Sequence, residues 1–82
     1  MRLTIIPSDK AIYINGISIH DLDVSYVPDE VHALQWQNDR GHIEYKDGRH
    51  PENIAILPDW ANQAINVYNS ASSILDSILE HN

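Results

Sequence analysis

The sequence contains no cysteine, and what it lacks narrows what the protein can be. Without Cys among its 82 residues, the chain can form neither a disulfide framework nor a thiolate that binds a metal or acts as a nucleophile. No stretch approaches the roughly 20 apolar residues of a membrane span, so no membrane partner is expected. The apolar run Leu3–Ile6 ends at Pro7 and is too short for the core of a signal peptide, which predicts a cytoplasmic protein.

Basic residues are scarce. Five Lys and Arg stand against 12 acidic residues, for a formal net charge of -7. Such a surface repels phosphates, so direct binding of nucleic acid is not expected. The charge also keeps a small protein soluble. A single domain of this length buries only about 60–65% of its unfolded surface, which leaves little room for a deep catalytic cleft.

The residue patterns of common active sites and metal sites are also missing. The three glycines are isolated, so there is no phosphate-binding loop, and no serine has the glycine pattern of a nucleophile elbow. No two histidines have the helical spacing of a zinc motif, and the acidic loop lacks the glycine of an EF-hand. We therefore expect no enzyme, no catalytic residue, no cofactor and no metal. The histidines expected on the surface are His20, His32, His42, His50 and His81.

The clearest local signal is Asn15-Gly16 between two runs of β-forming residues. Asn-Gly tolerates the positive φ angles of a tight turn, so this segment is predicted to be a β-hairpin. A two-residue turn places four isoleucines on one face of that hairpin. They are Ile12, Ile14, Ile17 and Ile19.

A first strand is predicted over Leu3–Ile6, and two further strands over Val31–Gln37 and His42–Lys46. The stretch 38–41 between them reads as a turn whose glycine takes the left-handed position. This loop length fixes the expected pairing of the second hairpin. The expected pairs are Trp36 with Ile43 and Leu34 with Tyr45.

The last third of the chain is predicted to be one long helix. Pro58 suits a first helical turn, Asp59 favours the positive end of the helix dipole, and neither Gly nor Pro follows. The apolar positions alternate at spacings of four and three, as in a heptad-like seam. They are Trp60, Ala64, Val67, Ala71, Ile74 and Ile78. The expected fold is therefore α+β, with a small antiparallel sheet of about four strands in two hairpins followed by this amphipathic helix.

The predicted helix is too long for the predicted sheet. A helix over 58–80 measures about 34 Å, whereas a strand of five residues spans about 17 Å. The second half can bend back, break within the weakly helical Ser70–Ser73, or pack against another chain, and we favour the last. Residues 1–69 are then the globular domain, and 70–82 form an extension for oligomerisation or partner binding. The candidate interface residues are Val67, Ala71, Ile74, Leu75, Ile78 and Leu79.

Four segments resemble a family of small proteins from tailed phages and prophages: Met1–Gly16, Val31–Gln37, Gly41–Tyr45 and Leu57–Ala61. That family is associated with the tail-fibre and tail-assembly region of phage genomes, and the resemblance spans residues 1–68. Its motifs are structural, so it implies a fold more than an activity, and it implies no catalytic residue. It also implies a protein in the host cytoplasm or associated with the virion.

The leading functional hypothesis is an accessory protein of tail or tail-fibre assembly. Its partner would be its own copies or a phage structural protein, bound through the C-terminal helix. A second hypothesis is an acidic inhibitor of a host nucleic-acid enzyme that imitates DNA. A third is a small-ligand module at an oligomer interface. The candidate acidic surface of the second is Asp21, Asp23, Asp29 and Glu30.

Overall fold

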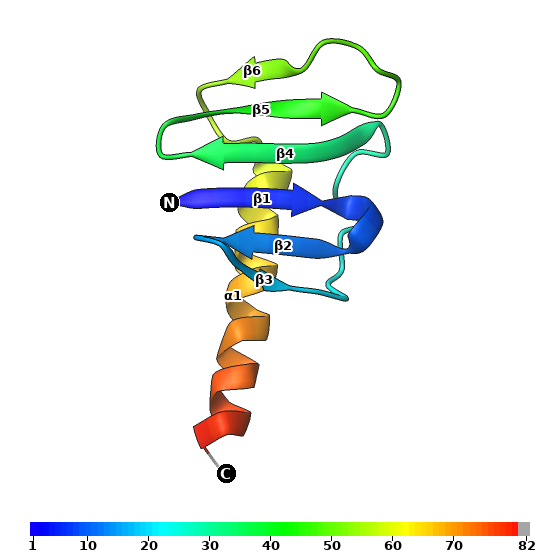
Figure 1. Cartoon of the computed structure of the whole chain (residues 1–82). Helices are drawn as coiled ribbons and strands as arrows, with labels where there is room; N and C mark the ends of the chain where they lie inside the picture. The colour runs from blue at the N-terminus through cyan, green and yellow to red at the C-terminus, as the bar shows by residue number, and fades with distance from the viewer. Residues whose placement is uncertain (81–82) are drawn as a thin grey trace.

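The computed structural model describes residues 1–80, with side chains as far as Leu75. It consists of one six-stranded antiparallel sheet and one long helix (Figure 1). The strands lie in the order β3-β2-β1-β4-β5-β6. The elements are β1 (Arg2–Ile6), the short 3-10 helix η1 (Pro7–Asp9), β2 (Ala11–Ile14), β3 (Ile17–Ile19), β4 (Val31–Gln37), β5 (Arg40–Tyr45), β6 (Glu52–Ile54) and α1 (Asp59–Glu80).

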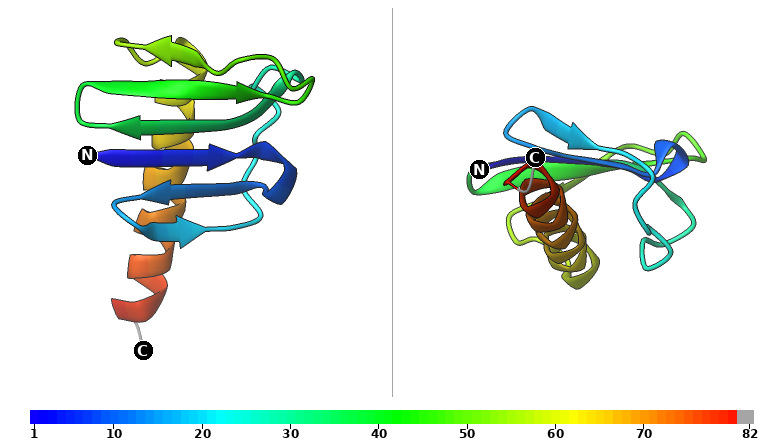
Figure 2. Two further views of the ribbon diagram at one scale, coloured as in Figure 1. Left: turned by 45° about the horizontal axis from the view of Figure 1, so that its top comes forward. Right: turned by 90° about the horizontal axis from the view of Figure 1, so that it is seen from below.

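The molecule has two layers. Helix α1 runs across one face of the sheet and crosses the strands (Figure 1). The connection between β3 and β4 lies on the same side as α1, and the opposite face of the sheet is open (Figure 2). The α+β class and the order of sheet before helix agree with the sequence prediction.

The first hairpin forms as predicted. Ile14 pairs with Ile17, and Ile12 pairs with Ile19. Both turn residues have positive φ, 53° at Asn15 and 84° at Gly16, which is the backbone shape that Asn-Gly favours. The Asn15 side chain also accepts a hydrogen bond of 3.0 Å from the backbone N–H of Arg2, which ties the turn to β1.

The predicted register of the second hairpin is wrong. Trp36 lies opposite Gly41, and Leu34 lies opposite Ile43. The turn is only two residues long because Asn38 itself takes the positive φ, 60°, that we had assigned to the glycine. Gly41 is instead required by packing, since a Cβ there would lie 2.2 Å from the carbonyl oxygen of Gln35.

The sheet has six strands, more than the expected four or so. The strand that the sequence did not reveal is β6, which pairs with β5 through Glu52 opposite Ile43. Three residues that follow Pro51 are too few to display the two-residue alternation by which a strand is recognised.

The core lies between α1 and the face of the sheet that carries Leu3, Ile5 and Leu34, which have no exposed surface. Ala61 and Ala64 face it from α1 with none exposed either, and such small side chains let the helix approach the strands closely. The helix begins at Asp59, one residue later than predicted. Pro58 lies just before it, and its carbonyl accepts a 2.9 Å hydrogen bond from the backbone N–H of Ala61.

Candidate protein interaction surface

Helix α1 is continuous through Ser70–Ser73, where a break was one of the open alternatives. Its 22 residues correspond to a length of about 33 Å. It neither bends back nor divides, and its C-terminal half extends beyond the edge of the sheet (Figure 1). None of the helices within the described residues is long and apolar enough to cross a membrane.

The first half of α1 is covered by the sheet. One row of side chains faces the strands, with Ala61 and Ala64 fully buried and Tyr68 8% exposed. The Tyr68 hydroxyl donates a hydrogen bond of 2.9 Å to the carbonyl oxygen of Ile17. Ile17 belongs to β3, the outermost strand on this side. The sheet therefore ends beneath Tyr68.

The stretch 69–80, here called the overhang, continues past that edge. Spacings of three and four residues extend the buried row from Tyr68 to Ala71 and Leu75. Leu75 is 49% exposed and its neighbour Ile74 is 62% exposed. A row that is buried against the sheet at its start thus becomes uncovered at its end.

The six candidate interface residues divide into three groups. Ile74 and Leu75 are exposed on the overhang, as an interface requires. Val67 and Ala71 are half-buried against the protein's own core, so only part of each is free to contact a partner. Ile78 and Leu79 belong to α1, but their side chains lie outside the described part of the structure.

Ile17 is an exposed apolar residue that the sequence analysis did not single out. It lies on the same face of the sheet as Ile12 and Ile14, yet 68% of its surface is exposed. The cause is its position in the edge strand, beside the place where α1 leaves the sheet. Strand order could not be predicted from the sequence, so Ile17 could not be separated from the buried Ile12 or from Ile14 and Ile19, which are half-buried.

Among residues 1–80, no strand pairs with the outer edge of β3, which ends the sheet on this side. In a two-residue hairpin the residues that flank the turn form the hydrogen-bonded pair, so the backbone N–H and C=O of Ser18 point away from β2. Natural edge strands are commonly protected by Lys, Pro or a bulge. The three residues of β3 are Ile-Ser-Ile, which carry no charge.

The four acids of the candidate acidic surface all lie on the connection between β3 and β4, and all are exposed. Asp23 is used locally, because its carboxylate accepts a 3.0 Å hydrogen bond from the backbone N–H of Ser25. This hydrogen bond lowers the pKa of Asp23. Asp21 has a φ of 61°, which Asp tolerates better than most residues. The four acids are therefore exposed along one connection, which runs from β3 to β4 past β2 and β1.

A second cluster of ionisable side chains lies near the turn after β5. The Tyr45 hydroxyl donates a hydrogen bond to Glu52, which raises the pKa of Tyr45. The Arg49 guanidinium lies 4.2 Å from the centre of the Tyr45 ring and 2.8 Å from Asp47, and hydrogen bonds from Arg49 lower the pKa of Asp47. Each of these groups has a partner within the cluster, so the arrangement resembles a structural network more than an acid–base pair.

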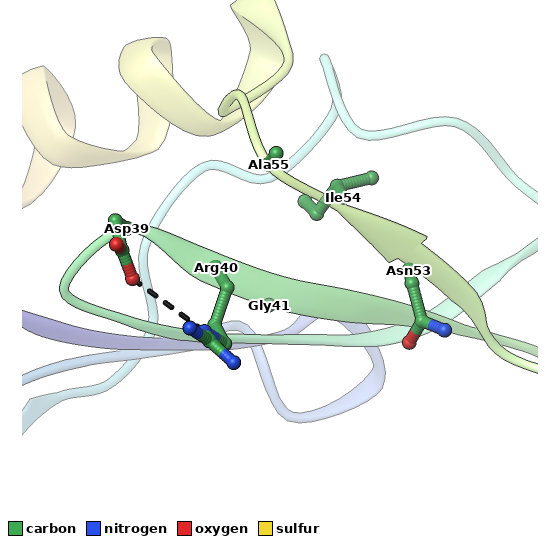
Figure 3. A pocket seen from close by; sticks show the side chains of 6 residues that line it. All are labelled: Asp39, Arg40, Gly41, Asn53, Ile54 and Ala55. Atoms are coloured by element: carbon green, nitrogen blue, oxygen red, sulfur yellow. Dashed lines mark ion pairs between the residues drawn. The ribbon is translucent and has the colours of Figure 1, made fainter.

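An open hollow of about 550 Å³ lies beside β5 and β6 (Figure 3). Arg40 and Asp39 at its rim pair with each other, with 3.6 Å between the Arg40 Nε and the nearer Asp39 carboxylate oxygen, and both side chains are more than four-fifths exposed. The hollow lies at the opposite edge of the sheet from the overhang, so it gives no support to a ligand site at that contact. Within the described residues no group of three metal-ligating side chains comes together. His81 lies outside them.

No family model matches the chain, and neither a curated protein nor a solved structure matches it. The surface of the molecule itself is then the guide to what it does.

Proposed function

We propose that this chain is a non-enzymatic accessory protein that acts by contact between protein chains, through the overhang of α1. One observation supports this above all others. The row of side chains that starts at the buried Ala61 and Ala64 continues to Leu75, which is half exposed beyond the edge of the sheet. Contiguous exposed apolar surface on a small soluble protein commonly marks a site of protein association.

The role we propose is in the assembly of a phage tail or tail fibre. The support for this part is the resemblance of residues 1–68 to small tailed-phage and prophage proteins. The partner would be further copies of the chain or a phage structural protein, in the host cytoplasm or in the virion. An assembly role needs a complementary surface and no reaction chemistry, which fits a chain whose clustered ionisable groups are paired with one another.

The test is to place two charges on the overhang in the full-length chain, at two positions of the predicted heptad-like seam, as Ile74→Asp with Ile78→Asp. We expect this double variant to lose its association with other chains, because each carboxylate would have to be desolvated in the contact. Light scattering coupled to size-exclusion chromatography measures the mass, and circular dichroism measures the fold. Asn66→Asp with Asn69→Asp is the matched control, since both asparagines are exposed on the same helix.

If the Ile74/Ile78 variant keeps the mass and the partners of the wild-type chain, the overhang is not the interaction surface. A truncated chain ending at Asn69 provides a second measurement. It should keep the sheet and lose the association. The partner itself is sought by affinity capture during phage production, and a tail structural protein or the chain itself is the expected product.

An inhibitor of a host nucleic-acid enzyme is the second candidate. The observation that favours it is the exposure of four acids on one connection, Asp21, Asp23, Asp29 and Glu30. Its partner would be a basic enzyme that elutes with salt, because screening weakens contacts between opposite charges. Replacing these four acids by their amides would abolish such a complex and leave an overhang contact intact.

A further inference from the structure

We infer that the partner which covers the overhang is a second copy of the chain, joined through β3 so that the two sheets form one continuous antiparallel sheet. This inference rests on the proposed function and names its partner. It follows from three features of the structure: the direction of the uncovered row, the free edge of β3 and the place where α1 crosses that strand.

The exposed side chains of the overhang point toward the plane in which the sheet would continue beyond β3. Tyr68 lies over β3 and bonds to it, and Leu75 extends the same row two turns further along a straight helix. Further strands beside β3 would lie opposite Leu75. The overhang is about 18 Å long and neighbouring strands lie about 4.8 Å apart, so it has room for about three to four of them.

A second copy of β3 meets the requirements for the first of these strands. The outward N–H and C=O of Ser18 pair with those of Ser18 in the second copy about a two-fold axis. Ile17 of each copy then lies opposite Ile19 of the other. Both are on the face that α1 covers. The exposed Ile17 therefore packs against an apolar neighbour, and the two overhangs pack against these isoleucines.

The position of α1 separates the two helices in this pairing. Tyr68 bonds to the carbonyl of Ile17, and α1 passes β3 near the start of that strand (Figure 1), on the side of the hairpin turn rather than centred on Ser18. A two-fold axis through Ser18 therefore places the two helices on opposite sides of the axis. They lie side by side and antiparallel, each beneath the sheet of the other copy.

The area fits two copies, whereas the like charge of the two copies opposes their association. Half the surface of an overhang about 18 Å long and about 10 Å wide offers on the order of 300 Å². The β3 edge with Ile17 adds a similar area on each copy. A two-fold contact therefore buries roughly 1,000–1,200 Å² in total, near the lower limit of a specific interface. All three charged residues of α1 are acidic, Asp59, Asp76 and Glu80. Antiparallel helices keep the two acidic C-terminal turns apart, and salt should strengthen the dimer by screening a charge of -7 on each copy.

The experiment uses the full-length chain in sedimentation equilibrium at several concentrations. The wild type should form a dimer of the 9.3 kDa chain, with a lower Kd at higher salt. Ile17→Lys on the strand edge and Leu75→Asp on the overhang should each raise that Kd about tenfold or more. Ile56→Lys is the matched control, because Ile56 is 83% exposed near the opposite edge of the sheet and should leave the Kd unchanged.

Amide hydrogen exchange gives a direct view of the edge. The Ser18 amide should exchange slowly above the Kd and rapidly below it, whereas a contact made by the helices alone leaves it fast at all concentrations. That result, or a dimer insensitive to Ile17→Lys, overturns the edge pairing. A wild-type monomer that still binds a tail protein overturns the second copy as partner and leaves the proposed function standing, and a monomer with no partner counts against both.

Discussion

The two halves of α1 share one spacing of apolar residues and differ in what lies opposite. In the first half the row faces strands and is buried, with Ala61 and Ala64 wholly covered. In the second half the same row reaches Leu75, where about half of the side chain is exposed. An amphipathic pattern therefore states that an apolar surface belongs opposite the helix, without stating which chain supplies it.

The largest loss of stability is expected when a buried side chain beneath the first half of α1 is truncated. Leu34, with no exposed surface, lies in the strand β4 that α1 crosses. Leu34→Ala should lower the free energy of unfolding by about 2–5 kcal/mol, because the cavity cannot fill completely. Urea denaturation measures this. A loss below about 1 kcal/mol would mean that the sheet is not the partner of the first half.

A smaller loss is expected at Gly41, which tests how closely the covered region is packed. A methyl group there would approach the Gln35 carbonyl oxygen to 2.2 Å and the Trp36 Cα to 2.9 Å. Both are backbone atoms that cannot move aside alone, so Gly41→Ala should destabilise the fold by about 1–3 kcal/mol. Gly48→Ala is the comparison variant. Nothing lies within 4 Å of a Cβ at Gly48, so any loss of stability there comes from the backbone strain of its positive φ of 80° and not from a close contact. Equal thermal stability of the wild type and the Gly41 variant would contradict the packing.

A polar contact lies at the boundary between the halves. Tyr68→Phe removes the hydrogen bond from its hydroxyl to the Ile17 carbonyl and leaves the ring in place. The free energy of unfolding should fall by about 0.5–1.5 kcal/mol, the usual net worth of one such bond. The measurement is again urea denaturation, now with Tyr13→Phe as the control, because the half-buried Tyr13 hydroxyl makes no hydrogen bond within the described residues.

The smallest effect on folding is expected on the overhang. Ile74 is 62% exposed, so Ile74→Ala should change the unfolding of the dilute monomer by no more than about 0.5 kcal/mol. The same variant should weaken association at high concentration. A loss as large as that of Leu34→Ala, found in the monomer, would show that the overhang is packed within its own chain and would remove the contrast between the two halves.

The sequence predicted those parts of the fold that depend on neighbouring residues. Asn15-Gly16 specifies its own turn, so the first hairpin and its register were correct. The 3.6-residue period of α1 needs no tertiary information and was also recognised. The second hairpin failed because Asn38 and Gly41 could both supply a positive φ, and only the packing of Trp36 over Gly41 decides between them.

The candidate interface was also predictable in part, from the length of the helix but not from the order of the strands. The length of the helix against the sheet was enough to predict that Ile74 and Leu75 would be exposed. The position along α1 at which the sheet stops burying the helix depends on strand order, and the sequence did not reveal that β3 is an edge strand. Hence Ile17 was missed, and Val67 was assigned to the partner although its own core takes part of it.

The positions of the two tryptophans determine what an optical experiment can detect. Trp36 is 7% exposed with its indole N–H bonded to the Asn38 carbonyl, and Trp60 lies half-buried near the start of α1. Both chromophores belong to the covered region, at a distance from the overhang. Their intrinsic emission will therefore report the unfolding of the sheet and the undocking of the helix from it.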